Sequence, residues 1–183
     1  MVLVGSVFQS LAPLAALVEK WPPLFTLFLP EVLLPFLFIQ VFEESGWTGS
    51  MQHTLQDQRG PLVASILVAP AFVVQHLPIV LIDASVGLGS VIIVGALVVV
   101  AVFFRVVIMW LYNGSGRSVP VVALFHSAYN SAWGTGDKKF ANDLLSGSAL
   151  LYAVVAVAVV AVAVVLAVLT RGRLACEPER ARS

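Results

Sequence analysis

Residues 144–170 read LLSGSALLYAVVAVAVVAVAVVLAVLT, a run of 27 residues without a charged side chain. About 20 apolar residues suffice for a helix to cross the hydrocarbon core of a bilayer, so this run predicts a transmembrane helix. The rest of the chain agrees, because 60% of its 183 residues are hydrophobic and only 11% are charged. A soluble domain has about 25% charged residues. We therefore expect a membrane protein and exclude a soluble enzyme.

Six apolar stretches predict an all-α, polytopic transmembrane helix bundle of about six spans. They cover residues 2–18, 23–42, 61–82, 84–112, 119–133 and 144–170. We expect an N-terminal membrane anchor helix at 1–22, a helical core that carries the site at 23–133, a C-terminal transmembrane helix at 134–170 and a polar cytoplasmic tail at 171–183. The distribution of basic residues favours both termini on the inner side of the membrane.

Charge, cysteine content and residue usage narrow the function classes further. Ten basic and ten acidic residues cancel, so we expect no nucleic-acid partner. The single cysteine, Cys176, supports neither a disulfide nor a metal cluster. Abundant Ala, Val and Arg with few Lys indicate a GC-rich bacterial genome, and hence a multi-pass protein of the bacterial cell membrane.

Polar residues inside apolar spans are costly unless they are paired or hydrated, so they mark candidate sites. Those that stand out are Glu31, Glu43, Glu44, His76, Arg105, His126 and Asn130. Glu31 lies between two prolines, and we interpret it as a structural or interfacial carboxylate. We interpret Arg105 as an interfacial arginine whose charged end reaches toward water.

The second span is expected to continue as a helix beyond Glu44 to a turn at Gly60, with the polar run 52–59, including His53, projecting into water. Glu44 lies 16 residues before Gly60 and His76 lies 16 residues after it. In a helical hairpin the two side chains would be level, ~24 Å from the turn. His126 and Asn130 are four residues apart and share one face of the fifth span.

These residue types can carry hydrolytic chemistry. Two histidines and a carboxylate can hold a catalytic zinc ion, for which His76 and His126 are the candidate ligands. A glutamate in a pocket of low polarity can act as a general base, and an asparagine amide can donate to an oxyanion. Together they predict hydrolysis of an amide bond in or near the bilayer. Two alternatives remain open: hydrogen bonds that only join helices, and a proton-coupled carrier using Glu44 and His76.

Three short motifs, in this order along the chain, resemble those of a known family. Residues 43–49, EESGWTG, resemble its first motif, EExxxR. Residues 72–78, FVVQHLP, resemble its FxxxH motif, and residues 126–130, HSAYN, resemble its HxxxN motif. Over residues 30–133 the chain is therefore similar to the CPBP (CAAX protease and bacteriocin-processing) family of intramembrane proteases, which includes the type II prenyl-protein proteases.

The resemblance implies a helical membrane bundle whose protease site lies inside the bilayer and acts on a peptide or protein substrate. By this resemblance Glu43 would activate the attacking water with help from His76. His126 and Asn130 would stabilise the tetrahedral oxyanion, and Glu44 would orient the site through the motif arginine. Zn²⁺ is one expectation for such a site, and metal-free activation of water by Glu and His is the other.

The chain departs from the first motif at one position, because Thr48 stands where the motif has arginine. Arg105 is a candidate replacement, since it is the one arginine within a long apolar span. The alternative is that Thr48 marks a catalytically weakened family member, which serves as a non-enzymatic membrane scaffold or immunity protein.

Overall fold

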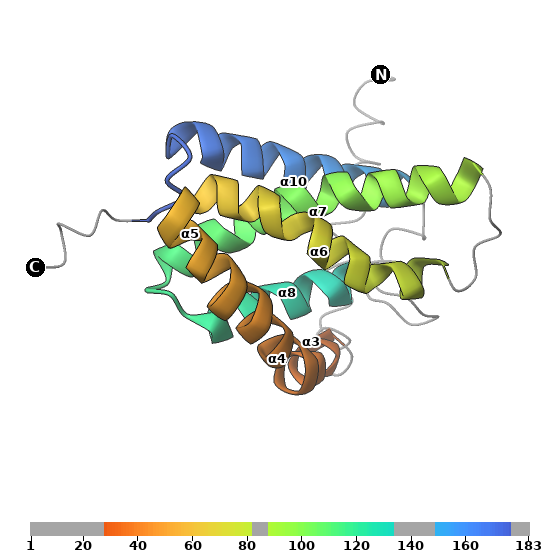
Figure 1. Cartoon of the computed structure of the whole chain (residues 1–183). Helices are drawn as coiled ribbons and strands as arrows, with labels where there is room; N and C mark the ends of the chain where they lie inside the picture. The colour runs from red at the N-terminus through yellow and green to blue at the C-terminus, as the bar shows by residue number, and fades with distance from the viewer. Residues whose placement is uncertain (1–27, 82–87, 134–148, 177–183) are drawn as a thin grey trace, which may run out of the picture.

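The computed structural model describes residues 28–81, 88–133 and 149–176 (Figure 1). Within these ranges the chain consists of helices and short turns, and no strand occurs. The all-α fold class predicted from the sequence is confirmed. The predicted anchor helix at 1–22 and the beginning of the predicted C-terminal helix at 134–170 lie outside the described residues.

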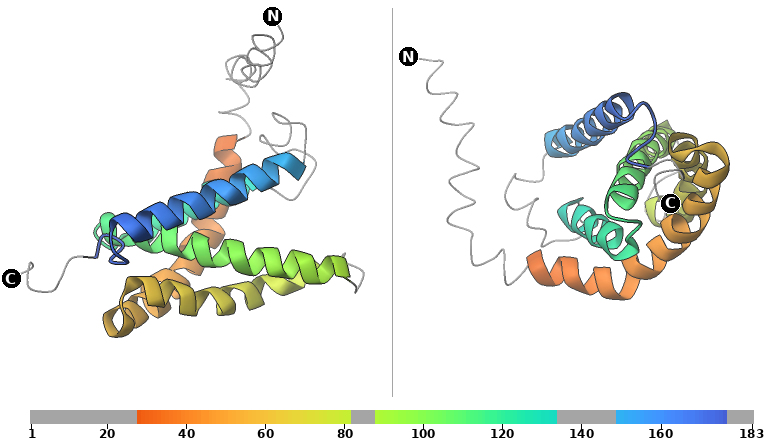
Figure 2. Two further views of the ribbon diagram at one scale, coloured as in Figure 1. Left: turned by 90° about the horizontal axis from the view of Figure 1, so that it is seen from above. Right: turned by 90° about the vertical axis from the view of Figure 1, so that its left-hand side faces the viewer.

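One long helix runs from Leu29 to Arg59 and alternates between α-helical and π-helical winding. Its segments are α3 (Leu29–Pro35), η2 (Phe36–Gln40), α4 (Val41–Glu44), η3 (Ser45–Gln52) and α5 (His53–Arg59). Gly60 ends the helix with a φ of 81°, which glycine adopts without strain, and Pro61 starts the next helix as the sequence predicted. The long helix curves around the outside of the other helices (Figure 2).

The inner face of the long helix carries a row of polar side chains. Gln40, Glu44, Thr48, Gln52 and Gln56 recur every four residues, and all five are buried. In an α-helix of 3.6 residues per turn, a spacing of four drifts by ~40° at each step, so five such residues would leave one face. The i→i+5 bonding of π-helical turns places more residues in each turn and offsets this drift. The predicted projection of 52–59 into water is therefore wrong for Gln52 and Gln56.

The other described helices are α6 (Pro61–Leu81), α7 (Leu88–Gly114), α8 (Val119–Trp133) and α10 (Ala149–Leu169). Helix α7 packs against α6, α8 and α10, and its residues Ile108 and Met109 are completely buried in the core. Helix α8 also packs against α3 and α4 of the long helix. The inner face of the long helix thus meets α6, α7 and α8 in one region.

Two described helices are long and apolar enough to cross a membrane, over Pro61–Pro78 and Val94–Gly114. A third apolar stretch, Ala156–Leu169, is shorter. The long helix turns large apolar side chains outward, and Phe38 and Phe42 are each 72% exposed. Such an apolar exterior suits lipid better than water and agrees with a membrane helix bundle. The number of six spans stays a prediction.

The segment after α10 folds back onto the bundle. Leu174 is completely buried in the core cluster that contains Ile108 and Met109. Its carbonyl oxygen accepts a hydrogen bond of 3.0 Å from Nδ2 of Asn113. Residues 171–176 of the predicted polar tail thus contact the bundle through Leu174, which is buried close to the end of α7, and residues 177–183 lie outside the described ranges.

Candidate active site

Glu44 forms the centre of the site, in α4 on the inner face of the long helix, and is completely buried. Arg105 of α7 donates from Nη1 to Oε2 at 3.0 Å and from Nη2 to Oε1 at 3.3 Å. His126 of α8 lies with Nδ1 2.7 Å from Oε1. Since a carboxylate beside an arginine only accepts, Nδ1 of His126 carries the hydrogen. Thr48 also donates its hydroxyl hydrogen to Oε2.

Glu43 and His76 form a second carboxylate–imidazole pair, between α4 and α6. Nε2 of His76 lies 3.9 Å from Oε1 of Glu43, and the side chains are 26% and 11% exposed. Nδ1 of His76 donates to the carbonyl oxygen of Phe72 at 2.8 Å, which leaves Nε2 on the side of Glu43. Gln75 donates from Nε2 to the same Glu43 oxygen at 3.3 Å.

The two pairs differ from the pairing expected by counting from Gly60. That count placed Glu44 level with His76, whereas Glu43 pairs with His76 and Glu44 pairs with His126. Counting residues predicts depth along a helix but not the side that a residue faces. The π-helical segments on both sides of Glu44 change the direction in which its side chain points. A count based on ideal α-helices therefore does not predict the pairing.

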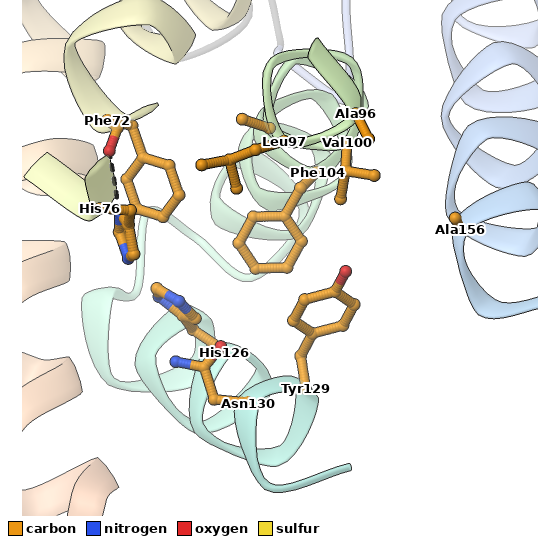
Figure 3. Close-up of a pocket in the computed structure, with 11 residues that line it drawn as sticks. Phe72, His76, Ala96, Leu97, Val100, Phe104, His126, Tyr129, Asn130 and Ala156 are labelled. Atoms are coloured by element: carbon orange, nitrogen blue, oxygen red, sulfur yellow. Dashed lines mark hydrogen bonds between the residues drawn. The ribbon is translucent and has the colours of Figure 1, made fainter. Parts of the chain in front are cut away.

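A cavity of about 480 Å³ opens beside these pairs and is lined by both His76 and His126. Figure 3 shows the two imidazole rings turned toward the same space, with Asn130 one turn along α8 from His126. The walls are apolar, and Phe104 packs its ring against the His126 ring with centroids 5.1 Å apart. The structure thus brings the five candidate residues from three helices into one region: Glu43, Glu44, His76, His126 and Asn130.

Arg105 does not reach toward water, so its interpretation as an interfacial arginine is wrong. Its side chain is completely buried and binds Glu44. The centre of the Phe72 ring lies 4.2 Å from Cζ of Arg105, within the range of a cation–π contact. This geometry agrees with the alternative interpretation from the sequence, in which Arg105 replaces the motif arginine at position 48 as the partner of Glu44.

Sequence reasoning missed two glutamines at the site. Gln75 accepts from Nε1 of Trp47 at 2.7 Å while it donates to Glu43, so it ties the long helix to α6. Gln52 donates from Nε2 to the carbonyl oxygen of Arg105 at 3.2 Å and to Oγ of Ser65 at 3.0 Å. Two features of the sequence could have indicated them. Gln75 directly precedes His76, and Gln52 follows Thr48 by four residues and Glu44 by eight.

Two other polar residues lie outside these pairs. His53 was expected to be solvent-exposed, but it is half-buried, with Nδ1 3.2 Å from the hydroxyl of Tyr112. Glu31 was interpreted as structural or interfacial, and its backbone oxygen accepts from Oγ of Ser131 at 2.6 Å. This hydrogen bond joins α3 to α8.

The fit of a zinc ion can be tested on the donor atoms. Zinc sites in enzymes use three protein ligands and leave one position for water. Among the described residues no group of three His, Cys, Asp or Glu side chains is placed to hold one metal ion. The Nδ1 hydrogen bonds of His76 and His126, to Phe72 and Glu44, leave Nε2 of each ring available to a metal, but two imidazoles are one ligand short of such a site. The arrangement of the described residues does not fit a zinc site.

Fold and site together define a helical membrane protein with a Glu/His/Asn site between its helices. A family model described as type II CAAX prenyl endopeptidase Rce1-like matches residues 25–132, which is more than half of the chain. The chain therefore belongs to this family of membrane-embedded CAAX-type proteases, and the family predicted from the motifs is confirmed. No curated protein and no solved structure matches the chain.

Proposed function

We propose that this protein is a multi-pass intramembrane endopeptidase of the cell membrane, which hydrolyses a peptide bond of a peptide or protein substrate at the bilayer. The observation that carries the proposal is the pair formed by Glu43 and His76, with 3.9 Å between Oε1 and Nε2. Both side chains retain some exposure, whereas the neighbouring pair of Glu44 and His126 is buried. The accessible pair of Glu43 and His76 is suited to activating water. The buried pair is suited to holding the His126 ring in place.

In the proposed reaction, a water molecule enters between Glu43 and His76. Its oxygen attacks the carbonyl carbon of the scissile peptide bond while its proton passes to the Glu43 carboxylate. The hydrogen bond from Nδ1 of His76 to the Phe72 carbonyl holds the imidazole ring in place. When the carbon–nitrogen bond breaks, the same proton passes from Glu43 to the leaving amine.

His126 and Asn130 provide the proposed oxyanion site from α8. Both line the apolar cavity, where a hydrogen bond to a developing charge is stronger than in water. The Asn130 amide can donate at any pH, and His126 donates from Nε2 when both ring nitrogens carry hydrogen. Glu44 accepts from Nδ1 of His126 and so orients the ring.

The decisive experiment measures peptide cleavage by the purified protein in lipid nanodiscs, with the wild type, Glu43→Gln and a matched control, Glu31→Gln. Both substitutions neutralise a glutamate of the same long helix, but Glu31 lies outside the two carboxylate–imidazole pairs. We expect Glu43→Gln to lower kcat by about 100-fold or more and Glu31→Gln to stay near wild type. A chelator should leave cleavage intact, because in the described part of the chain no three metal-ligating side chains lie together.

The alternative, a non-enzymatic scaffold or immunity protein, is favoured by one observation, Thr48 in place of the motif arginine. It predicts that the wild type cleaves no peptide of a broad library and that Glu43→Gln leaves its function unchanged. Either result, obtained with a folded protein, would overturn the protease proposal.

A further inference from the structure

We propose that Arg105 is the positioning residue of this site, supplying from α7 the cationic partner of Glu44 that position 48 of the long helix lacks. This inference rests on the proposed function and adds a residue outside the three motifs. Its motivation is the completely buried carboxylate of Glu44, because a buried charge without a partner is strongly destabilising. Among the described residues, the basic side chains within ion-pair distance of Glu44 are Arg105 and His126.

The contact between Arg105 and Glu44 is bidentate. Nη1 and Nη2 donate to the two different carboxylate oxygens, Oε2 and Oε1, at 3.0 and 3.3 Å. Such a fork fixes the plane of the carboxylate as well as its charge, which a single contact cannot do. Because Oε1 also accepts from Nδ1 of His126, the fixed carboxylate fixes the His126 ring.

Position 48 reaches the same place from the other side. Thr48 lies one turn after Glu44, and its hydroxyl contacts both Oε2 of Glu44 and Nη1 of Arg105, the latter at 3.1 Å. A longer basic side chain at position 48 would therefore point into the volume that the Arg105 guanidinium now occupies. The positive charge beside Glu44 therefore has one location, and a side chain from either the long helix or α7 can place it there.

Arg105 also connects to the second imidazole, through Phe72. The guanidinium lies over the Phe72 ring, whose centroid is 4.3 Å from the centroid of the His76 ring. The Phe72 carbonyl accepts the hydrogen of His76 Nδ1. Arg105 is held in turn by Gln52, which donates to its backbone oxygen. One side chain of α7 thus supports His126 through Glu44 and His76 through Phe72.

The test moves the arginine from one helix to the other. It compares the wild type with Arg105→Leu, Arg105→Lys and the double variant Thr48→Arg/Arg105→Leu, in nanodiscs and with the same peptide. We expect Arg105→Leu to lower kcat by about 100-fold or more with a much smaller change in KM, because it disturbs groups that act in the transition state. Arg105→Lys should have a kcat between those of Arg105→Leu and the wild type, since lysine keeps the charge but cannot bind both carboxylate oxygens in the bidentate way of arginine.

The kcat of the double variant should be at least tenfold higher than the kcat of Arg105→Leu. Arg117→Leu is the matched control, because Arg117 is also an arginine paired with an acid, Asp57, but stands outside this site. It should retain the wild-type kcat. A wild-type kcat in folded Arg105→Leu, or a folded double variant without recovery, would overturn the proposal. If Arg105→Leu does not fold, Arg105→Lys decides, and an unchanged kcat in that variant overturns it.

A readout independent of cleavage separates this inference from the proposed function. In ¹⁵N NMR of histidine-labelled protein, the Nδ1 signal of His126 should be that of a protonated nitrogen in the wild type. We expect it to shift in Arg105→Leu and to return toward its original position in the double variant. If the wild type cleaves no peptide but the signals behave in this way, the protease proposal fails and the role of Arg105 stands. An unchanged His126 signal in Arg105→Leu contradicts the role of Arg105.

Discussion

Thr48 donates its hydroxyl hydrogen to Glu44 from one turn along the same helix, and both side chains are completely buried. We predict that Thr48→Val, which keeps the volume and removes the donor, lowers the free energy of unfolding by about 1–3 kcal/mol. Thr54→Val is the matched control, because Thr54 is exposed and its hydroxyl donates to the backbone oxygen of Ser50. The control should change stability by less than about 0.5 kcal/mol.

Thermal and denaturant unfolding of the two variants in the same detergent would measure this difference. Equal stability of Thr48→Val and Thr54→Val would mean that Arg105 and His126 satisfy the carboxylate without the hydroxyl.

Single residues of the site were predictable from the sequence to different degrees. The residues Glu43, His76 and His126 stand out because polar side chains are rare in apolar spans, and the structure places all three near one cavity. The pairing was not predictable, because a one-residue difference decides which glutamate faces which histidine. The contact of Arg105 with Glu44 joins residues 61 positions apart, and an isolated arginine in a span fits an interfacial position equally well.

The π-helical segment η3 packs closely against the beginning of α8. A Cβ atom added at Gly49 would lie 2.9 Å from Cγ2 of Val119, closer than carbon atoms approach in proteins. At Gly46, in the same segment, an added Cβ meets nothing within 4 Å. Gly49 therefore permits the close approach of two helices, and Gly46 has no such role.

We predict that Gly49→Ala destabilises the protein by about 1–3 kcal/mol through this overpacking, whereas Gly46→Ala is neutral or slightly stabilising because alanine favours helices. Val119→Ala in the Gly49→Ala background should restore part of the loss by removing the contacting methyl groups. Unfolding of the wild type, Gly49→Ala, Val119→Ala and the variant with both substitutions makes a double-mutant cycle, which measures the coupling. Additive effects of the Gly49 and Val119 substitutions would contradict the packing explanation.

Helices with distinct boundaries were predicted well, and the π-helical winding was not. Helix α8 occupies 119–133 as expected, and α6 begins at Pro61 as expected, because proline and glycine mark these ends in the sequence. The polar residues of the long helix are spaced by four. In a regular α-helix this spacing does not keep five residues on one face, so the sequence pattern did not predict a continuous polar row. Its burial depends on packing against α6, α7 and α8, which a local pattern cannot show.

The described part of the molecule buries a charged cluster and exposes large apolar side chains, as expected for a protein in a bilayer. The charged cluster of Glu44 and Arg105 has no exposed side-chain surface, whereas Phe38 and Phe42 of the same long helix face outward. Composition alone predicted this class of protein. The number of spans stays a prediction, and two of the described helices meet the length and hydropathy needed to cross a membrane.

The segment after α10 packs against the bundle near the end of α7, and Leu174 is the residue that anchors it. Leu174 is completely buried, while Leu169, five residues earlier, is 76% exposed. We predict that Leu174→Ala lowers the free energy of unfolding by about 2–5 kcal/mol, because it removes a buried side chain and leaves a cavity beside α7. Leu169→Ala makes the same chemical change on an exposed surface and should cost less than about 0.5 kcal/mol.

Both variants are to be unfolded in nanodiscs and in detergent, because the comparison between the two media separates burial in protein from contact with lipid. Leu174→Ala should be destabilised equally in both, since Leu174 belongs to a core cluster of protein side chains that includes Ile108 and Met109. If instead Leu169→Ala proves the more costly in both media, the C-terminal segment does not pack against α7. The polar tail predicted from the sequence would then describe residues 171–176 better than the folded-back segment does.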